Sequence, residues 1–409
     1  MSQHRLDALQ RHAGSLLLLM VLVLMPLGRS AELPVLLAAL LGLRELPRLR
    51  RDPDTYPVSV VFLAYWLPEL ISAPDAIEPA KAWTEVLADL RFLPFLLFAQ
   101  AQLRSAPTLR RVLGGSAAVL MLWLLDALVQ ATTGFSLGGS NLTDRLSGIF
   151  GDDNLKLGGV LATLSPLLLW QVRSLGGRKG LIAAALLCLW VILLAGARAA
   201  WLVYGLVLIA LLWRELGGGR RALIGMVVAA VLGLSSGLAM WQLSPRFAER
   251  IERTAAALQG DTAALDHALS FRLPIWRTAL CMIEQHPWNG VGVRGFRHAY
   301  PDCAEADDRF IDPTQDIGAL HAHQWVLEVL SETGVLGLSC WCIGIAWLAR
   351  WYRRRDPQER IDVFPVSVAL LVLLFPLNTH YALYSSFHGL LLFWLLGLWL
   401  APTSPARTT

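Results

Sequence analysis

Residues 221–242, RALIGMVVAAVLGLSSGLAMWQ, form an apolar run whose single charged residue, Arg221, stands at its first position. Such a run fits the roughly 17–25 residues that cross the hydrocarbon core of a bilayer. The 409-residue chain contains many similar runs and is 55% hydrophobic and 16% charged, whereas soluble proteins carry about 25% charged residues. These values exclude a soluble enzyme, a secreted disulfide scaffold and a disordered chain. They predict an all-α polytopic integral membrane protein.

Apolar runs bounded by charged residues predict about 12 transmembrane helices. The second run is short for a span, and the break at Gly196-Ala197-Arg198 separates the seventh from the eighth. The expected spans are 13–28, 31–43, 56–73, 86–103, 110–132, 155–173, 179–196, 198–213, 221–242, 321–349, 361–378 and 383–401.

The distribution of Lys and Arg predicts the orientation of these spans. Alternate connections on one side hold 21 Lys and Arg, and the short connections on the other side hold 5. Positive residues are concentrated in cytoplasmic connections. We therefore expect both termini to be cytoplasmic.

One long connection, residues 243–320, is expected on the outer face between spans 9 and 10. A structureless loop of this length is uncommon. Ser244 and Pro245 are typical of a helix start, and a second helical stretch is predicted from about Leu265 to Gln285, with Pro274 as a kink or boundary. The expected organisation is transmembrane helices 1–9 in 1–242, a partly helical periplasmic loop module in 243–320, and helices 10–12 with a cytoplasmic tail in 321–409.

The five cysteines show no metal-binding spacing. Cys281 and Cys303 both lie in the outer module, where a disulfide is possible, although two free thiols are the alternative. The sequence contains no CxxC and no Walker motif. We expect no metal, no nucleotide cofactor and no nucleic-acid partner.

Several arginines are candidates for binding an anion. Arg198 lies among small residues in a connection almost too short to be solvated, so its side chain is expected to enter a cavity; an ordinary loop arginine is the alternative. Arg272 has apolar neighbours, and its planar fork of donors suits a diphosphate. Arg294 is a possible supporting residue, and the alternative for the loop arginines is solvated charges balanced by carboxylates.

His323 is a candidate general base because a neutral imidazole accepts protons near pH 7. His321 lies two residues earlier, and on a helix the two side chains would diverge by about 200°. A capping or interfacial histidine is the alternative for either. Glu328 and Glu332 follow one turn apart, and Glu328 is a candidate for orienting the imidazole or binding a sugar hydroxyl. Its alternative is a charge that faces a polar cavity without chemistry.

Four elements resemble the O-antigen ligase and polymerase superfamily. His323-Gln324, nine residues and then Gly334-Val335-Leu336-Gly337 are similar to the ligase pattern H-[N/S/Q]-x9-G-x-x-G, with Leu338 departing from the usual next position. The stretch 286–292, HPWNGVG, resembles HP-x-x-G-x-G. The stretch 196–201, GARAAW, is similar to S-R-x-x-W/L with Ala in place of Ser, and 150–154 is similar to an element ending in Asn154.

The resemblance implies a GT-C-like O-antigen ligase in the bacterial inner membrane with its active site facing the periplasm. Such an enzyme transfers O-antigen from undecaprenyl diphosphate to a sugar of lipid A-core, without metal and with inversion. The family pattern implies that Arg198 and Arg272 bind the diphosphate and that His323 is the catalytic base.

Other functions are also compatible with a polytopic membrane protein. An O-antigen polymerase, or a ligase that glycosylates a protein such as a pilin, uses the same donor with a different acceptor. A transporter or flippase would have charges paired near the membrane midplane and internal symmetry, but the polar residues here gather at the outer rim and the sequence shows no repeat. A structural subunit leaves Arg198 and His323 unexplained.

Overall fold

The computed structural model describes residues 3–140, 145–151, 154–243, 248–249, 251–252, 266, 269–379 and 382–401, with side chains from His12 onward. The helix predicted to start at Ser244 and Pro245, and most of the cytoplasmic tail, lie outside these residues. The described chain is almost entirely helical, and its two short strands pair antiparallel with Phe135 opposite Ser140 and Ser136 opposite Gly139.

The helices follow one another along the chain with short connections. Their bounds are α1 Gln3–Leu24, α2 Glu32–Gly42, α3 Arg48–Arg51, α4 Tyr56–Ser72, α5 Pro79–Asp89, α6 Phe92–Gln102, α7 Ala106–Thr133, α8 Lys156–Leu194, α9 Arg198–Glu215, α10 Gly219–Leu243, α13 Leu273–Gln285, α14 Phe296–Cys303, α15 Trp325–Arg354, α16 Pro357–Asp362, α17 Phe364–Leu373 and α18 Ser386–Trp399. The 3-10 helices are η1 Met25–Ala31, η2 Leu43–Glu45, η3 Pro53–Thr55 and η4 Gly148–Phe150, and the strands are β1 Phe135–Ser136 and β2 Gly139–Ser140.

Helical structure lies on each of the predicted apolar runs. Within the described residues, five helical segments are long and apolar enough to cross a membrane. They are His12–Glu45, Ala106–Thr133, Lys156–Leu194, Gly219–Leu243 and Trp325–Arg354. The chain is therefore a helical membrane protein, and the full count of 12 spans stays a prediction.

Two boundaries differ from the sequence prediction. The predicted span 86–103 is broken between α5 and α6, where Arg91 forms ion pairs with Asp89 at 2.7 Å and with Glu32 at 3.3 Å. Spans 6 and 7 are joined as α8 across a kink at Gly177, whose φ of 64° is left-handed. The helical stretch predicted from Leu265 to Gln285 is divided at the boundary expected near Pro274, where α13 begins with this proline in its first turn.

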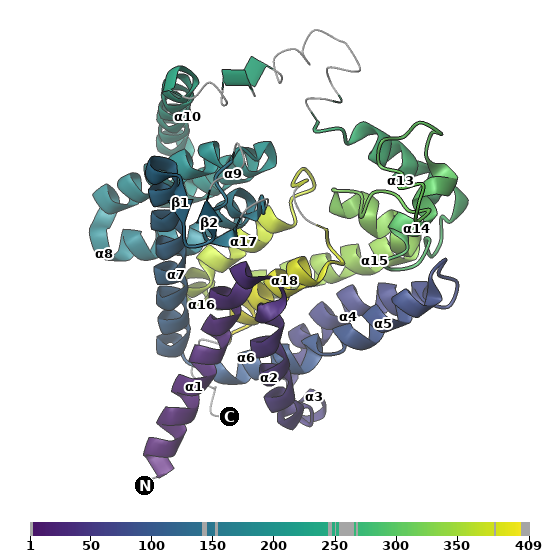
Figure 1. Cartoon of the computed structure of the whole chain (residues 1–409). Coiled ribbons are helices and arrows are strands. Elements are labelled where there is room, and N and C mark those ends of the chain that lie inside the picture. The colour runs from purple at the N-terminus through teal and green to yellow at the C-terminus, as the bar shows by residue number, and fades with distance from the viewer. Residues whose placement is uncertain are drawn as a thin grey trace.

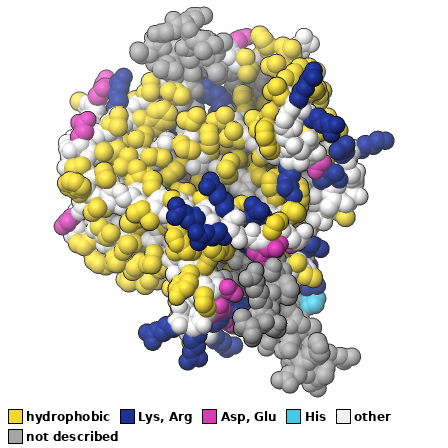
Figure 2. Space-filling view, turned by 180° about the vertical axis from the view of Figure 1, so that it is seen from behind, with side chains coloured by type: hydrophobic (Ala, Val, Ile, Leu, Met, Phe, Trp, Pro, Cys, Tyr) yellow, Lys and Arg dark blue, Asp and Glu magenta, His cyan; other side chains and the backbone are white. Residues whose placement is uncertain are grey.

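Helices α13 and α14 lie to one side of the long helix α15, and α10 stands at the opposite side of the molecule (Figure 1). The two short helices share a small core of their own around Ile275, Met282, Phe296 and Tyr300. Figure 2 shows hydrophobic side chains covering most of one face. The exposed apolar residues include most of α10, for example Leu234, which is 70% exposed. This surface suits contact with acyl chains.

A backbone contact attaches the loop module, which contains α13 and α14, to the membrane helices. Helix α15 is interrupted at Gly334, where φ is 65° and ψ is −168°. The stretch 287–292 fits into this kink: Val335 N and Leu336 N donate to the carbonyls of Pro287 and Trp288, at 2.9 and 3.1 Å.

In a second pair of hydrogen bonds at this contact, the loop stretch donates and α15 accepts. The amides of Val291 and Gly292 donate to the carbonyls of Ser331 and Glu332, at 2.8 and 2.9 Å. Two sequence elements of the family resemblance, 286–292 and the glycines after His323, are thus one packing unit.

Glycine is required at this contact because the two backbones touch. A Cβ on Gly290 would lie 2.3 Å from the carbonyl carbon of Glu332, and a Cβ on Gly334 would lie 2.2 Å from Trp288 O. Both glycines also have a positive φ. Neither position has space for a side chain.

We predict that Gly290→Ala and Gly334→Ala each destabilise the protein by about 2–4 kcal/mol, from the left-handed backbone and the steric overlap together. Thermal unfolding of the purified variants in detergent measures this. Gly205→Ala is the control, because a Cβ there meets nothing within 4 Å and Ala favours a helix. Equal melting temperatures for all three variants would contradict the packing argument.

The structure joins Cys281 of α13 to Cys303 of α14 by a disulfide. This bond links the two helices that share the small core of the loop module. We predict that unreduced, alkylated peptides contain this linked pair, and that reduction removes about 3 kcal/mol of stability from the module. The exposed thiol of Cys342 is the control and should be alkylated without reductant. Alkylation of Cys281 and Cys303 under the same conditions would disprove the bond.

Candidate functional site

Arg198 begins helix α9 at a tight turn after α8. Gly196 has a φ of 70°, and Trp201 Nε1 donates to Ile192 O at 3.1 Å across the turn. Gly158 of α8 packs against this turn, since a Cβ there would lie 3.0 Å from Ala195 Cβ. The small residues thus let the start of α8 approach the residue that carries the guanidinium.

Arg198 and Arg272 meet at one corner of the loop module. Arg198 Nη2 donates to Ser270 Oγ at 2.9 Å, two residues before Arg272. Arg272 Nη1 donates to Thr379 Oγ1 at 2.8 Å, in the connection between α17 and α18. Three elements distant in sequence thereby converge on this corner.

Positive charge accumulates at the same corner. Burial is the main cause that lowers the pKa of Arg272 to about 10, followed by the charges of Arg198 and Arg145. At neutral pH the guanidinium is still charged. Like charges held close together in a partly buried place favour an anion between them, and a diphosphate fits this requirement.

His321 and His323 face each other, which corrects the expectation that they diverge on a helix. Helix α15 begins only after Gln324, whose side chain accepts from the amide of Leu327, and His323 has a left-handed φ of 53°. Because the N-cap residue Gln324 follows the histidines in the sequence, they lie outside the helix and their backbone need not be helical. As a result, His321 Nε2 lies 3.1 Å from His323 Nδ1.

The segment that carries the histidines is held from two sides. Trp276 Nε1 of α13 donates to Ala322 O at 3.0 Å, and Gln324 Nε2 donates to Pro376 O at 3.1 Å. The histidine pair therefore lies where the loop module meets the connection between α17 and α18.

His321 is neutral at physiological pH. Burial is the main cause that lowers its pKa to about 4, followed by the charges of Arg294 and Arg272. A neutral imidazole beside His323 can accept a hydrogen bond from Nδ1–H of His323. In that arrangement His321 stabilises the imidazolium that forms when His323 takes up a proton.

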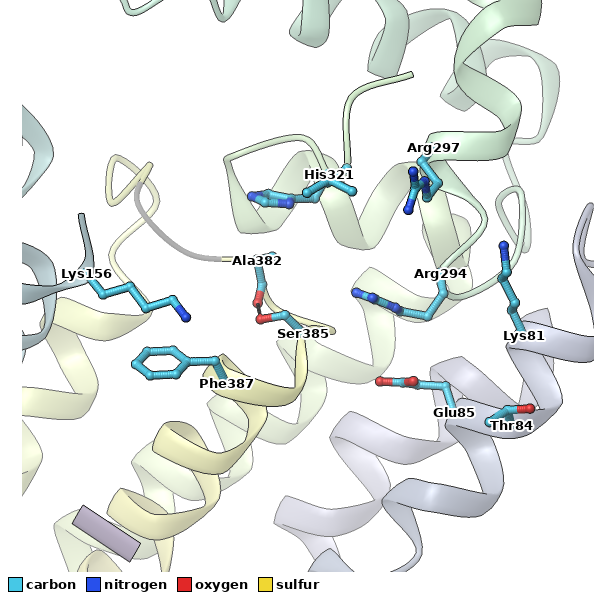
Figure 3. A pocket seen from close by; sticks show the side chains of 11 residues that line it. Lys81, Thr84, Glu85, Lys156, Arg294, Arg297, His321, Ala382, Ser385 and Phe387 are labelled. Atoms are coloured by element: carbon cyan, nitrogen blue, oxygen red, sulfur yellow. Dashed lines mark hydrogen bonds between the residues drawn. The ribbon is translucent and has the colours of Figure 1, made fainter. Parts of the chain in front are cut away.

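A cavity of about 510 Å³ opens beside the histidine pair. Its wall includes His321, Arg294, Arg297, Lys81 and Lys156. In Figure 3, Lys156 and Arg294 extend toward each other from opposite sides of the cavity, and Glu85 lies below Arg294. The sequence analysis singled out Arg294 but not Lys81, Glu85 or Lys156, although each is an ionisable residue near the edge of an apolar run.

Glu328 and Glu332 of α15 hold the loops that form this cavity. The Glu328 carboxylate accepts from the amides of Leu383 and Tyr384 at 3.0 and 3.2 Å. Glu332 accepts from the amides of Arg294 and Phe296 at 2.9 and 3.4 Å. These bonds give both carboxylates a positioning role, and a catalytic role for Glu328 stays a prediction.

Two further residues are held in place around the cavity. Arg294 Nη1 donates to Tyr384 O at 3.2 Å. Asn154 Oδ1 accepts from the amide of Lys156 at 3.4 Å, at the start of α8. Asn154 thereby supports the turn from which Lys156 reaches the cavity.

Left-handed backbone is concentrated at this site. Among the described non-glycine residues, five have a positive φ: Ser270, Phe271, Arg294, Asp316 and His323. Four of them carry or adjoin the candidate residues. Such strain costs of order 1–3 kcal/mol at each residue and clusters at functional sites.

In the described part of the chain, no group of three or more His, Cys, Asp or Glu side chains is arranged to hold a metal ion. The charged groups at the site are mainly guanidinium and ammonium groups. These can stabilise a departing diphosphate directly.

Comparison with known protein families gives a match in the middle of the chain. The O-antigen ligase family model matches residues 183–342, which contain Arg198, Arg272 and the histidine pair. No curated protein matches the chain. Over residues 183–342 the chain is therefore similar to the O-antigen ligase family.

Proposed function

We propose that this protein is an O-antigen ligase, a glycosyltransferase that moves O-antigen polysaccharide from undecaprenyl diphosphate to a sugar hydroxyl of lipid A-core. One observation carries the proposal: His321, whose pKa is lowered by burial and by the charges of both Arg294 and Arg272, has its Nε2 3.1 Å from Nδ1 of His323. The proposed base, His323, would thus lie between the diphosphate site and a cavity that can hold the second substrate.

The chemistry follows from these positions. Arg198 and Arg272 bind the donor diphosphate and stabilise the negative charge that grows as its bond to the anomeric carbon breaks. His323 removes the proton from the acceptor hydroxyl, whose oxygen forms the new glycosidic bond. The diphosphate leaves from the opposite face, so the anomeric configuration is inverted. The diphosphate bond supplies the energy, and neither metal nor nucleotide takes part.

The two histidines can have different roles. If Nδ1–H of His323 donates to Nε2 of neutral His321, the other nitrogen of His323 is the proton acceptor. His321 is then a positioning residue that selects the tautomer of the base and stabilises its charged form.

Topology supports the same proposal. The excess of Lys and Arg on one side of the predicted spans favours cytoplasmic termini, with the loop module facing the periplasm of the bacterial inner membrane. The donor lipid would approach through the hydrophobic face (Figure 2), and the polar acceptor would enter beneath the loop module.

A reconstituted assay tests the proposal. Purified protein in detergent is mixed with undecaprenyl diphosphate-linked O-antigen and lipid A-core, with EDTA and without nucleotide, and products are separated by gel electrophoresis. A ladder on lipid A-core is the expected result. Elongation of the donor glycan alone would identify a polymerase, and glycan on an added pilin would identify a protein O-oligosaccharyltransferase; either would overturn the ligase assignment.

His323→Ala should lower kcat by about 10²–10⁴-fold, because the acceptor then loses its general base. His321→Leu should lower kcat less and change the pH dependence of kcat, whereas His321→Gln keeps an acceptor for Nδ1–H and should restore part of the loss. Initial rates between pH 5 and pH 9 measure both effects. Near-normal turnover by His323→Ala would place the base elsewhere.

Arg198→Lys and Arg272→Lys should each reduce kcat/KM by about 10–100-fold, as expected from losing one hydrogen bond to a charged group, because lysine cannot reproduce the bidentate fork. Arg277→Lys is the matched control, since its side chain is 66% exposed and pairs with Glu305 at 3.6 Å on the same module. Retention of full activity by both site variants would show that the diphosphate binds elsewhere.

A further inference from the structure

The cavity beside His321 is formed mainly by segments that do not contribute to the proposed diphosphate site at Arg198 and Arg272. Lys81 and Glu85 come from α5, Lys156 from the start of α8, and Arg294 and Arg297 from the loop module. Arg198 and Arg272 do not belong to its wall. Lys81, Glu85 and Lys156 also lie outside the residues that match the family model.

The charge of this cavity is strongly positive. Four cationic side chains, Lys81, Lys156, Arg294 and Arg297, face one carboxylate, Glu85. Glu85 lies below Arg294 in Figure 3 and is oriented toward the cavity. Grouping four cations in a partly enclosed space is unfavourable unless an anion binds there.

The contacts of these cations hold them at the cavity wall. Lys156 Nζ lies 4.3 Å from the centre of the Phe387 ring, and Lys81 Nζ lies 2.6 Å from His298 Nε2. Arg297 Nε is buried and has no hydrogen-bond partner among the described residues. The cavity therefore offers cationic donors together with an apolar ring.

The volume and lining indicate the chemical class of the ligand. About 510 Å³ lies within the roughly 300–1,000 Å³ of small-molecule sites. Phe387 and Leu320 give apolar surface for a sugar ring, and Glu85 can accept hydrogen bonds from hydroxyls. A neutral sugar alone does not require four cations, whereas a sugar bearing phosphate does.

Phosphate could come from the donor diphosphate or from the acceptor. The corner formed by Arg198 and Arg272 already suits the diphosphate, and His321 connects that corner to the cavity. We propose that the cavity is the acceptor subsite and that Lys81, Lys156, Arg294 and Arg297 bind phosphate groups on the acceptor sugars. This inference rests on the proposed function and deepens it, because it makes acceptor phosphorylation a determinant of specificity.

Kinetics with two acceptors test the inference. The acceptors are lipid A-core and the same material stripped of phosphate with hydrofluoric acid. Wild-type protein should show an acceptor KM at least tenfold lower for the phosphorylated form. Lys156→Gln and Arg297→Gln should each raise the KM for the phosphorylated acceptor about 10–100-fold, leave the donor KM unchanged and reduce the preference between acceptors.

Arg277→Gln serves as the control for loss of one positive charge on the same module. Melting temperatures establish that each variant is folded. A second measurement, which needs no turnover, is equilibrium binding of phosphorylated and dephosphorylated core oligosaccharide to the protein without donor.

The possible outcomes separate the two proposals. Equal KM values for both acceptors in the wild type, or an increase in the donor KM alone in the variants, would overturn the acceptor subsite. Absence of any transfer, together with phosphate-dependent oligosaccharide binding that Lys156→Gln and Arg297→Gln abolish, would reject the ligase function and support the subsite.

Discussion

The contact between residues 287–292 and the kink of α15 determines where the functional groups lie. Four backbone hydrogen bonds join these segments across Gly290 and Gly334. Through this contact the loop module is fixed to the membrane helices, so that Arg294 and His321 are placed beside Lys156 and Ser385. A side-chain contact could tolerate substitution and repacking, but two touching backbones leave no space for a Cβ.

Two buried carboxylates on α15 complete the scaffold. Glu328 binds the amides of the 383–384 segment, and Glu332 binds those of Arg294 and Phe296. One helix thus orients both the membrane side and the loop side of the cavity. Because the oxygens of Glu332 accept hydrogen bonds from the amides of Arg294 and Phe296, the strained backbone at Arg294 is held in place. The cations that line this cavity are then held in position before a ligand arrives.

Much of the helical framework could be predicted from apolar runs and charges. Arg198 and His323 stood out because ionisable residues at the edges of spans are uncommon, and Arg272 stood out because its neighbours in the loop are apolar. The histidine pair could not be predicted. Sequence spacing assumed a helix through residue 323, whereas the Gln324 cap and the left-handed φ of His323 bring the rings together. The cationic cavity was missed for another reason: Lys81, Lys156 and Arg297 come from three separate segments, and their proximity depends on tertiary packing.

We propose that the donor diphosphate binds between Arg198 and Arg272 and that the acceptor binds on the other side of the histidine pair. The most direct measurement is a cryo-electron microscopy structure of the protein with undecaprenyl diphosphate. We expect phosphate density that contacts both guanidiniums, with the terminal phosphate facing His323 and the cavity around Lys156 and Arg297 left available for the acceptor. Phosphate density inside that cavity, with Arg198 and Arg272 making no contact to it, would contradict this placement of the donor.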